Sequence, residues 1–146
     1  ILGPGEGLPS GLVWSLLPVE GADGTRALLV GTDAGLATLE FGLWRSFGRA
    51  SGLLDPSVYG LCVTEGPDLP RTLWLGTRSL GVAEFREGGW RFHGAREGLP
   101  TPSVMALLEW PEASGRKVLL AGVQGRGVWR FDGRRWSAFP GPAPIL

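Results

Sequence analysis

The stretch Thr72–His93, with the sequence TLWLGTRSLGVAEFREGGWRFH, decides the fold of this chain. Apolar runs of roughly four to six residues alternate in it with glycine-containing turns, a pattern that is typical of short strands joined by hairpins. Two further copies of the pattern occur, at Ala27–Phe47 and at Val118–Phe139. The chain therefore consists of three copies of one unit and of the segments that connect them.

The copies follow one another at a regular distance of 45 to 46 residues. Such internal repetition is the first sign of a repeat architecture. The step is 45 residues only across the first copy, which is one residue shorter between Thr32 and Gly35. Equivalent positions include the series Trp44, Trp90 and Trp136, the series Gly31, Gly76 and Gly122, and the pairs Gly7-Leu8, Gly52-Leu53 and Gly98-Leu99.

Each unit predicts four strands, of which the first two are apolar at nearly every position. Continuous apolar runs of this length indicate strands that are buried on both faces. The third and fourth strands carry more polar residues, such as Glu40, Glu84 and Arg91, as outer strands should. The predicted strands are Val13–Leu17, Leu28–Thr32, Leu36–Glu40 and Trp44–Phe47, then Val58–Val63, Leu73–Thr77, Val82–Arg86 and Trp90–His93, then Val104–Leu108, Leu119–Val123, Val128–Asp132 and Trp136–Phe139.

Repeated four-stranded units of about 45 residues are typical of the blades of a β-propeller. We predict an all-β fold, a β-propeller of which three four-stranded antiparallel blades are visible. One propeller-type domain spans residues 1–146, with blades at about 3–47, 48–93 and 94–140 and a tail at 141–146. A β-solenoid is the second choice, although its coils are shorter, and the regular glycines disfavour a helical repeat.

Several motifs recur in a fixed order. They are represented by Gly98-Leu99-Pro100, Val104–Leu107, Leu73–Thr77 and Gly127–Phe131. In this order they resemble the two-component regulator propeller repeat family, and the resemblance covers nearly the whole chain. The third copy departs from the pattern at Leu120 and Val123, where the middle copy has Trp and Thr. The resemblance implies a sensor module of a bacterial signalling protein, placed in the periplasm or outside the cell ahead of a transmembrane helix and a histidine kinase. It does not identify a ligand.

Three blades do not close a ring, since propellers typically have four to eight. The visible chain is therefore expected to be part of a longer propeller or half of a six-bladed homodimer. Residues 1–2 align with the end of a preceding fourth strand, and residues 141–146 align with a linker toward a further blade. The expected partners are further blades, from the same chain or from another copy, and an unidentified small ligand or protein.

Composition excludes several other partners. The 14 basic and 14 acidic residues cancel, so nothing favours nucleic acid or an acidic membrane surface. No apolar run reaches the ~20 residues of a membrane span. Cys62 is the single cysteine and cannot form an internal disulfide, which leaves the compartment open.

Motifs for catalysis, metals and cofactors are not found, and we predict no catalytic residue, no metal and no cofactor. His93 is the single histidine and stands where the other copies have Phe47 and Phe139, so we interpret it as an imidazole in an aromatic slot. One histidine without a cysteine pair does not make an ordinary zinc site. The equivalent tryptophans are expected to pack between blades, whereas Trp110 breaks the repeat and is expected to be exposed.

Candidate binding residues lie in the connections that open on one face of a propeller, namely those after the second and the fourth strand of each blade. Loops on a rigid scaffold carry function more often than strands do, and the arginine fork suits carboxylates and phosphates. The candidates are Arg49, Arg78, Arg96, Arg126, Gln124 and Asp33. The alternative is that these side chains form an ordinary solvated rim, in which neighbouring acidic residues balance the charge of the arginines. On the opposite face we expect local ion pairs, Asp23 with Arg26, Asp68 with Arg71 and Glu112 with Arg116.

The sequence thus favours a non-enzymatic module that binds a ligand or partner. A structural or assembly role, in which the open blade edges dock into a larger complex, is the alternative from a different class. A propeller-type lyase or hydrolase is the weakest of the three.

Overall fold

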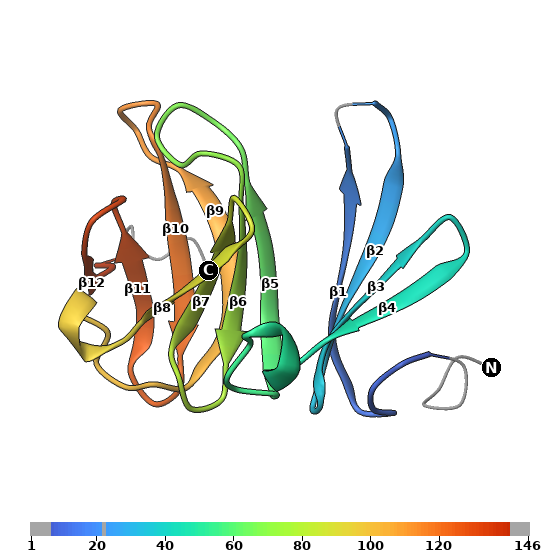
Figure 1. The fold of residues 1–146 in the computed structure, drawn as a ribbon. Helices are drawn as coiled ribbons and strands as arrows, with labels where there is room; N and C mark the ends of the chain where they lie inside the picture. The colour runs from blue at the N-terminus through green and yellow to red at the C-terminus, as the bar shows by residue number, and fades with distance from the viewer. Residues whose placement is uncertain (1–6, 22, 141–146) are drawn as a thin grey trace, which may run out of the picture.

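A computed structural model describes residues 7–21 and 23–140 of the chain. It confirms the all-β prediction, with three antiparallel four-stranded sheets that follow one another along the chain (Figure 1). We call the sheets blades 1, 2 and 3. The strands are β1 Val13–Glu20, β2 Arg26–Thr32, β3 Gly35–Glu40 and β4 Leu43–Phe47 in blade 1, β5 Val58–Thr64, β6 Thr72–Thr77, β7 Val82–Arg86 and β8 Gly89–His93 in blade 2, and β9 Val104–Pro111, β10 Lys117–Val123, β11 Gly127–Phe131 and β12 Trp136–Ala138 in blade 3.

Every blade is a simple meander, in which each strand pairs with the next one along the chain. The first strands β1, β5 and β9 stand next to one another, and the fourth strands lie at the outside (Figure 1). All twelve predicted strands are present, although β1 and β9 run three residues further than predicted. The predicted tail, residues 141–146, and the start of the first predicted blade, residues 3–6, lie outside the described residues. The division of the domain into blades at the predicted boundaries remains a prediction.

Two apolar clusters hold the blades together, one at each junction. Between blades 1 and 2, Leu29 of β2 packs with Leu75 of β6 in a mainly aliphatic cluster. Between blades 2 and 3, Trp74 of β6 packs with Leu119 of β10 and Phe131 of β11. Burial of large apolar side chains contributes roughly 1.5–3 kcal/mol each, so these clusters are the main source of cohesion.

The recurring glycine of the second strands permits the blades to approach closely. A Cβ atom built on Gly76 would lie 2.7 Å from the carbonyl oxygen of Val104, which begins the first strand of blade 3. Any side chain at this position would therefore push the neighbouring backbone away. This contact explains why glycine recurs at a position inside a strand, where it otherwise lacks a side chain to pack.

The Gly-Leu pairs close the connections between blades. Two of these connections contain short 3-10 helices, η2 Arg49–Ser51 and η3 Ala95–Glu97, each ended by a glycine in the left-handed conformation. Gly98, with φ +102°, lies directly against Trp136, and a Cβ atom there would meet the tryptophan backbone oxygen at 2.5 Å. The leucine that follows, Leu99, is buried in the cluster between blades 2 and 3. The motif therefore seats each connection against the fourth strand of the blade that it enters.

Some sequence predictions fail in detail. The first strands were expected to be buried on both faces, which holds for β5 but not for the largely exposed β1 and β9. The cause is that only blade 2 has a neighbour on each side within the described residues.

The expected local ion pairs on the opposite face are wrong as well. Arg71 pairs instead with Glu65, and Asp68 pairs with Arg116 of the adjacent blade. Glu112 pairs with Arg130, and Asp23 accepts a hydrogen bond from the backbone N–H of Thr25. Arg116 and Arg130 lie on other segments than their partners, whereas Glu65 lies in the same connection as Arg71, so the expected spacing of three or four residues does not identify the pairs.

Candidate functional site

The predicted binding face is formed by the connections at the lower edge of Figure 1, where the first strands begin. It combines the segments before β5 and β9 with the turns after β2, β6 and β10. We call this surface the loop face. The structure places all six candidate residues on segments that contribute to it: Arg49 in η2, Arg96 in η3, and Asp33, Arg78, Gln124 and Arg126 in the turns between second and third strands.

Asp55 ties the loop face of blade 2 together. Its carboxylate is only 4% exposed and accepts a hydrogen bond from the backbone N–H of Ser57 at 3.0 Å. Its other oxygen accepts from both the backbone N–H and the hydroxyl of Ser79, at 2.6 and 2.7 Å. Because Ser79 follows Arg78 in the turn after β6, this buried carboxylate fixes the turn from which Arg78 projects.

Two candidate residues take part in further contacts between loops. The carboxylate and the backbone oxygen of Asp33 lie 3.3 and 3.4 Å from the Ser57 hydroxyl, which connects blade 1 to the segment before β5. The Gln124 side-chain oxygen accepts a hydrogen bond from the Ser103 hydroxyl at 2.8 Å. Asp33 and Gln124 therefore fasten neighbouring loops, a role that the sequence did not predict for them.

The four candidate arginines are all exposed. Within residues 7–21 and 23–140, none of their side chains forms an ion pair. Glu97 lies beside Arg96 in the chain but turns back to accept a hydrogen bond from the Gly94 backbone N–H at 2.7 Å, and this bond lowers the pKa of the Glu97 carboxyl. The arginines are thus available to an acidic group. In the described part of the chain, no ion pair at these positions supports the alternative, a rim in which neighbouring acids balance the arginines. Whether the arginines bind anything stays a prediction.

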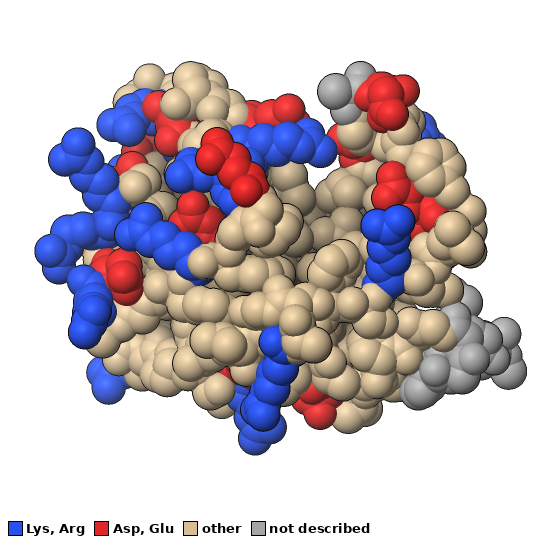
Figure 2. Space-filling view, viewed as in Figure 1, with Lys and Arg blue, Asp and Glu red and all other residues tan. Residues whose placement is uncertain are grey.

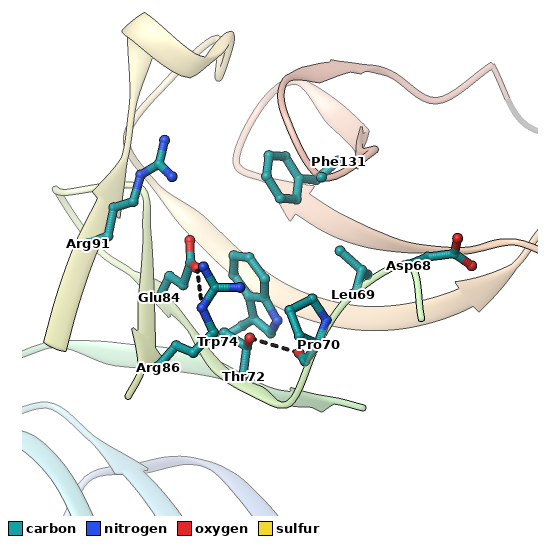
Figure 3. A pocket seen from close by; sticks show the side chains of 10 residues that line it. Asp68, Leu69, Pro70, Thr72, Trp74, Glu84, Arg86, Arg91 and Phe131 are labelled. Atoms are coloured by element: carbon teal, nitrogen blue, oxygen red, sulfur yellow. Dashed lines mark hydrogen bonds and ion pairs between the residues drawn. The ribbon is translucent and has the colours of Figure 1, made fainter. Parts of the chain in front are cut away.

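A second concave site lies between blades 2 and 3, and the sequence did not predict it (Figure 3). The cavity of about 90 Å³ is lined by Trp74, Glu84 and Arg86 of blade 2 and by Phe131 of blade 3, with Arg91 at its edge. Arg86 lies 3.9 Å from the Glu84 carboxylate, which is a loose ion pair.

Glu84, which lines this cavity, forms a buried pair with His93. The His93 ring is fully buried, and its Nε2 atom lies 2.7 Å from a Glu84 carboxylate oxygen. The imidazole contacts the rings of Trp74, Phe131 and Trp136 with centroids 5.0 to 6.3 Å apart, so it does occupy an aromatic slot between blades. Glu84, which the sequence placed on a polar outer strand, is buried with it. The repeat alignment marks only His93 as an exception, against Phe47 and Phe139, whereas the equivalents of Glu84 are the polar Thr38 and Arg130.

The tryptophans of the fourth strands were predicted to pack between blades, and they differ in burial. Trp136 is buried between blades 2 and 3, whereas Trp44 and Trp90 are half-buried. Trp110 is 41% exposed, as its departure from the repeat indicated. The described residues contain no group of three or more His, Cys, Asp or Glu side chains that could hold a metal ion.

Comparison with known proteins supports the fold. No family model matches the chain, and no curated protein matches it. Among solved structures, the chain is similar to the extracellular domain of a putative hybrid two-component system from B. thetaiotaomicron, with a TM-score of 0.53 and 21% sequence identity. The match covers 86% of this chain and 14% of the other, so the chain spans about a seventh of that domain's length. The helices that the structure describes include none long and apolar enough to cross a membrane.

Proposed function

We propose that this chain is a binding segment of a propeller sensor that lies outside the cytoplasmic membrane, and that it recognises carboxylate groups on its loop face without catalysis. Two observations support the location and the sensor role. The motif order resembles that of sensor propellers, and the similar solved structure is an extracellular domain of a two-component system. Because both observations are resemblances to other proteins, the sensor role is a proposal for this chain.

The observation that carries the binding proposal is the combination of fixed loops and free arginines. Asp55, Asp33 and Gln124 hold neighbouring loops by hydrogen bonds, while the guanidinium groups of Arg78 and Arg126 remain exposed. A rigid base lowers the entropy that a binding site loses when it orders around its ligand. Arginine can present two parallel N–H donors to a carboxylate, which gives both affinity and direction.

A charge reversal at two arginines tests this proposal. We expect the Arg78→Glu, Arg126→Glu variant to bind an oligo-glutamate peptide or citrate at least about 10-fold more weakly than the unchanged chain, since hydrogen bonds to charged groups contribute roughly 1.5–3 kcal/mol each. Isothermal titration calorimetry at low salt measures the two affinities. Comparison of the peptide with citrate distinguishes an acidic protein partner from a small carboxylate ligand.

The matched control is Arg45→Glu with Arg134→Glu, which reverses two exposed arginines away from the loop face. The control should bind the probes about as well as the unchanged chain, and both variants should keep the unfolding midpoint within about 2 °C, because exposed substitutions rarely change stability by more than about 0.5 kcal/mol. If both double variants lose affinity for the probes equally, the change in net charge explains the loss and the proposal is refuted. An undiminished affinity of the loop-face variant would refute it as well.

An assembly role is the second candidate, and a separate observation favours it. Large apolar side chains are exposed on the free sides of blades 1 and 3, among them Leu16 at 62% and Leu108 at 55%.

A further inference from the structure

Each first strand contains a β-bulge at the same repeat position, close to the loop face. In β1 the pairing with β2 passes over Trp14, and in β5 the pairing with β6 passes over Tyr59. In β9 the pairing with β10 passes over Met105 in the same way. Bulges re-aim a side chain and are over-represented next to active sites. All three lie at the second residue of their strand, at the end where the loop face begins (Figure 1).

The three bulged residues are large, apolar and partly exposed. Trp14 is 50% exposed and Met105 is 42% exposed, and Tyr59 stays partly exposed although blade 2 has a neighbour on each side. The residue before each bulge is valine in all three blades, and the residue after it is small: Ser15, Gly60 and Ala106. The bulge position alone varies, from Trp to Tyr to Met, so the packing of the blades does not determine its side chain.

Trp14 and Tyr59 form a ring pair that bridges blades 1 and 2. Their ring centroids lie 5.0 Å apart and the ring planes are 83° apart, an edge-to-face arrangement. Because half of Trp14 is exposed, its indole can contact a further ring, which also favours offset-stacked or edge-to-face geometry. Met105 adds a polarisable thioether, a group that contacts aromatic rings favourably. We call Trp14, Tyr59 and Met105 the bulge cluster.

The polar residues of the loop face are fixed beside this cluster. In every blade the backbone N–H of the first residue after the second strand donates to the carbonyl oxygen two residues before the bulge. These bonds, of 3.0 to 3.2 Å, join Asp33 to Leu12, Arg78 to Ser57 and Gln124 to Ser103. Ser57 precedes Tyr59 by two residues, which in a strand corresponds to about 7 Å. Of the three residues after the second strands, Arg78 is the cation, so an anion next to the ring pair is expected to bind there.

The surroundings of the cluster are apolar for a surface. Leu54 in the segment before β5 and Leu80 in the turn after β6 are both exposed. In Figure 2 the lower part of the molecule, where the loop face lies, shows mostly residues other than Lys, Arg, Asp and Glu, whereas charged side chains of both signs gather toward the upper part. Exposed apolar groups that polar residues surround are typical of ligand-binding surfaces.

We propose that the bulge cluster and Arg78 form a site for a small aromatic carboxylate. The ring of the ligand lies against Trp14 and Tyr59, and its carboxylate accepts hydrogen bonds from the Arg78 guanidinium. This inference rests on the proposed recognition of carboxylates at the loop face, and it adds the ring to the chemistry of the ligand. Contact with the cluster removes the ring from water, while the planar arginine fork orients the carboxylate.

Three probes separate the contribution of the ring from that of the carboxylate: 3-phenylpropionate, propionate and 3-phenylpropanol. We expect 3-phenylpropionate to bind at least about 10-fold more tightly than either of the others, since burial of a phenyl ring and a charged hydrogen bond each exceed the free energy of a tenfold change. NMR titration of the isotope-labelled chain measures these affinities, and the indole N–H signal of Trp14 reports contact at the cluster.

Two tryptophan variants locate the ring. Trp14→Leu keeps an apolar side chain but removes the indole, so the affinity for 3-phenylpropionate should fall at least about 5-fold, because ring-on-ring contact is lost. Its affinity for propionate should change less than about 2-fold, which also shows that the variant is folded. The matched control is Trp110→Leu, which removes a similarly exposed indole at the opposite end of β9 and should change neither affinity.

The outcomes distinguish this inference from the proposed function. If 3-phenylpropionate binds no more tightly than propionate, or if both tryptophan variants weaken it equally, the aromatic site is refuted, while carboxylate binding that depends on Arg78 would stand. If 3-phenylpropanol binds as tightly as 3-phenylpropionate, Arg78 is no part of the site and the inference is refuted as well. If neither carboxylate probe binds, both the inference and the proposed carboxylate recognition are wrong.

Discussion

The junction between blades 2 and 3 uses the same repeat positions as the side of blade 3 that points away from blade 2, which we call the trailing face and which includes Leu108 and Val128. The junction is buried, whereas the trailing face is exposed to solvent within the described residues. Val82 is fully buried at the junction, and its equivalent Val128 is 45% exposed on the trailing face. Both positions hold the same amino acid. The comparison shows that burial in this fold is decided by the presence of a neighbouring blade and is not visible in the residue type.

The two surfaces differ most in their polar residues. At the junction, the buried Glu84 is paired with His93. On the trailing face, the repeat equivalent of Glu84 is Arg130, whose guanidinium contacts Glu112 with an Nη2–Oε2 distance of 2.9 Å. A buried pair stabilises a junction only if both partners are present, so the junction should be sensitive to single substitutions and the open face tolerant of them.

A large difference should follow from removal of one carboxylate. We expect Glu84→Ala to lower the free energy of unfolding by about 1–3 kcal/mol, since it leaves the buried His93 Nε2 atom without its hydrogen-bond partner. The equivalent change Arg130→Ala should cost less, about 1 kcal/mol, because its pair with Glu112 keeps 26% and 25% of the two side chains exposed, whereas the His93 ring is fully buried. Urea titration followed by tryptophan fluorescence measures both values, and similar costs for the two variants would contradict the comparison.

A similar difference is expected from the glycines of the second strands. A methyl group at Gly76 would meet the Val104 carbonyl oxygen at 2.7 Å, whereas one at Gly122 has its nearest neighbour, the Ala106 Cβ, at 3.5 Å. We therefore expect Gly76→Ala to destabilise the chain by about 1–3 kcal/mol through overpacking. Gly122→Ala should be neutral or stabilising by about 0.5 kcal/mol in the single chain.

Thermal unfolding of both alanine variants checks this prediction. If Gly122→Ala were the more harmful of the two under dilute conditions, the assignment of Gly122 to an uncovered face would be wrong.

The smallest effect concerns acid titration at the trailing face. The hydrogen bond from Arg130 lowers the pKa of the Glu112 carboxyl from its ordinary value of 4.5. A carboxyl with a lowered pKa contributes stability above its unfolded pKa, and this contribution is lost as the pH falls through the folded pKa. NMR titration should therefore find the Glu112 pKa below 4.5, and Arg130→Gln should return it toward that value. An unchanged Glu112 pKa in the variant would show that the pair is absent.

The sequence predicts the strands well, because apolar runs and glycine turns repeat three times and each copy supports the others. It also locates the candidate binding loops, since the order of strands determines which connections share an end of the blade. It could not predict that Asp33 and Gln124 fasten loops, because their partners Ser57 and Ser103 lie on other segments. The sequence does not reveal the pair of Glu84 and His93, because the equivalents of Glu84, Thr38 and Arg130, are polar as well and nothing in the repeat marks Glu84 as buried.

The most direct test of the account compares cysteine reactivity at two equivalent positions. Cys62 lies at the junction of blades 2 and 3, and burial raises the pKa of its thiol to about 11, so the reactive thiolate is scarce at pH 8. Its repeat equivalent on the trailing face is Leu108. We predict that Leu108→Cys in a Cys62→Ala background reacts with a thiol reagent at least about 100-fold faster than Cys62 in the unchanged chain, when both are measured as dilute folded protein, because ionisation and access both favour the exposed thiol. Equal rates at the two positions would contradict the claim that the trailing face is a blade interface without its neighbour.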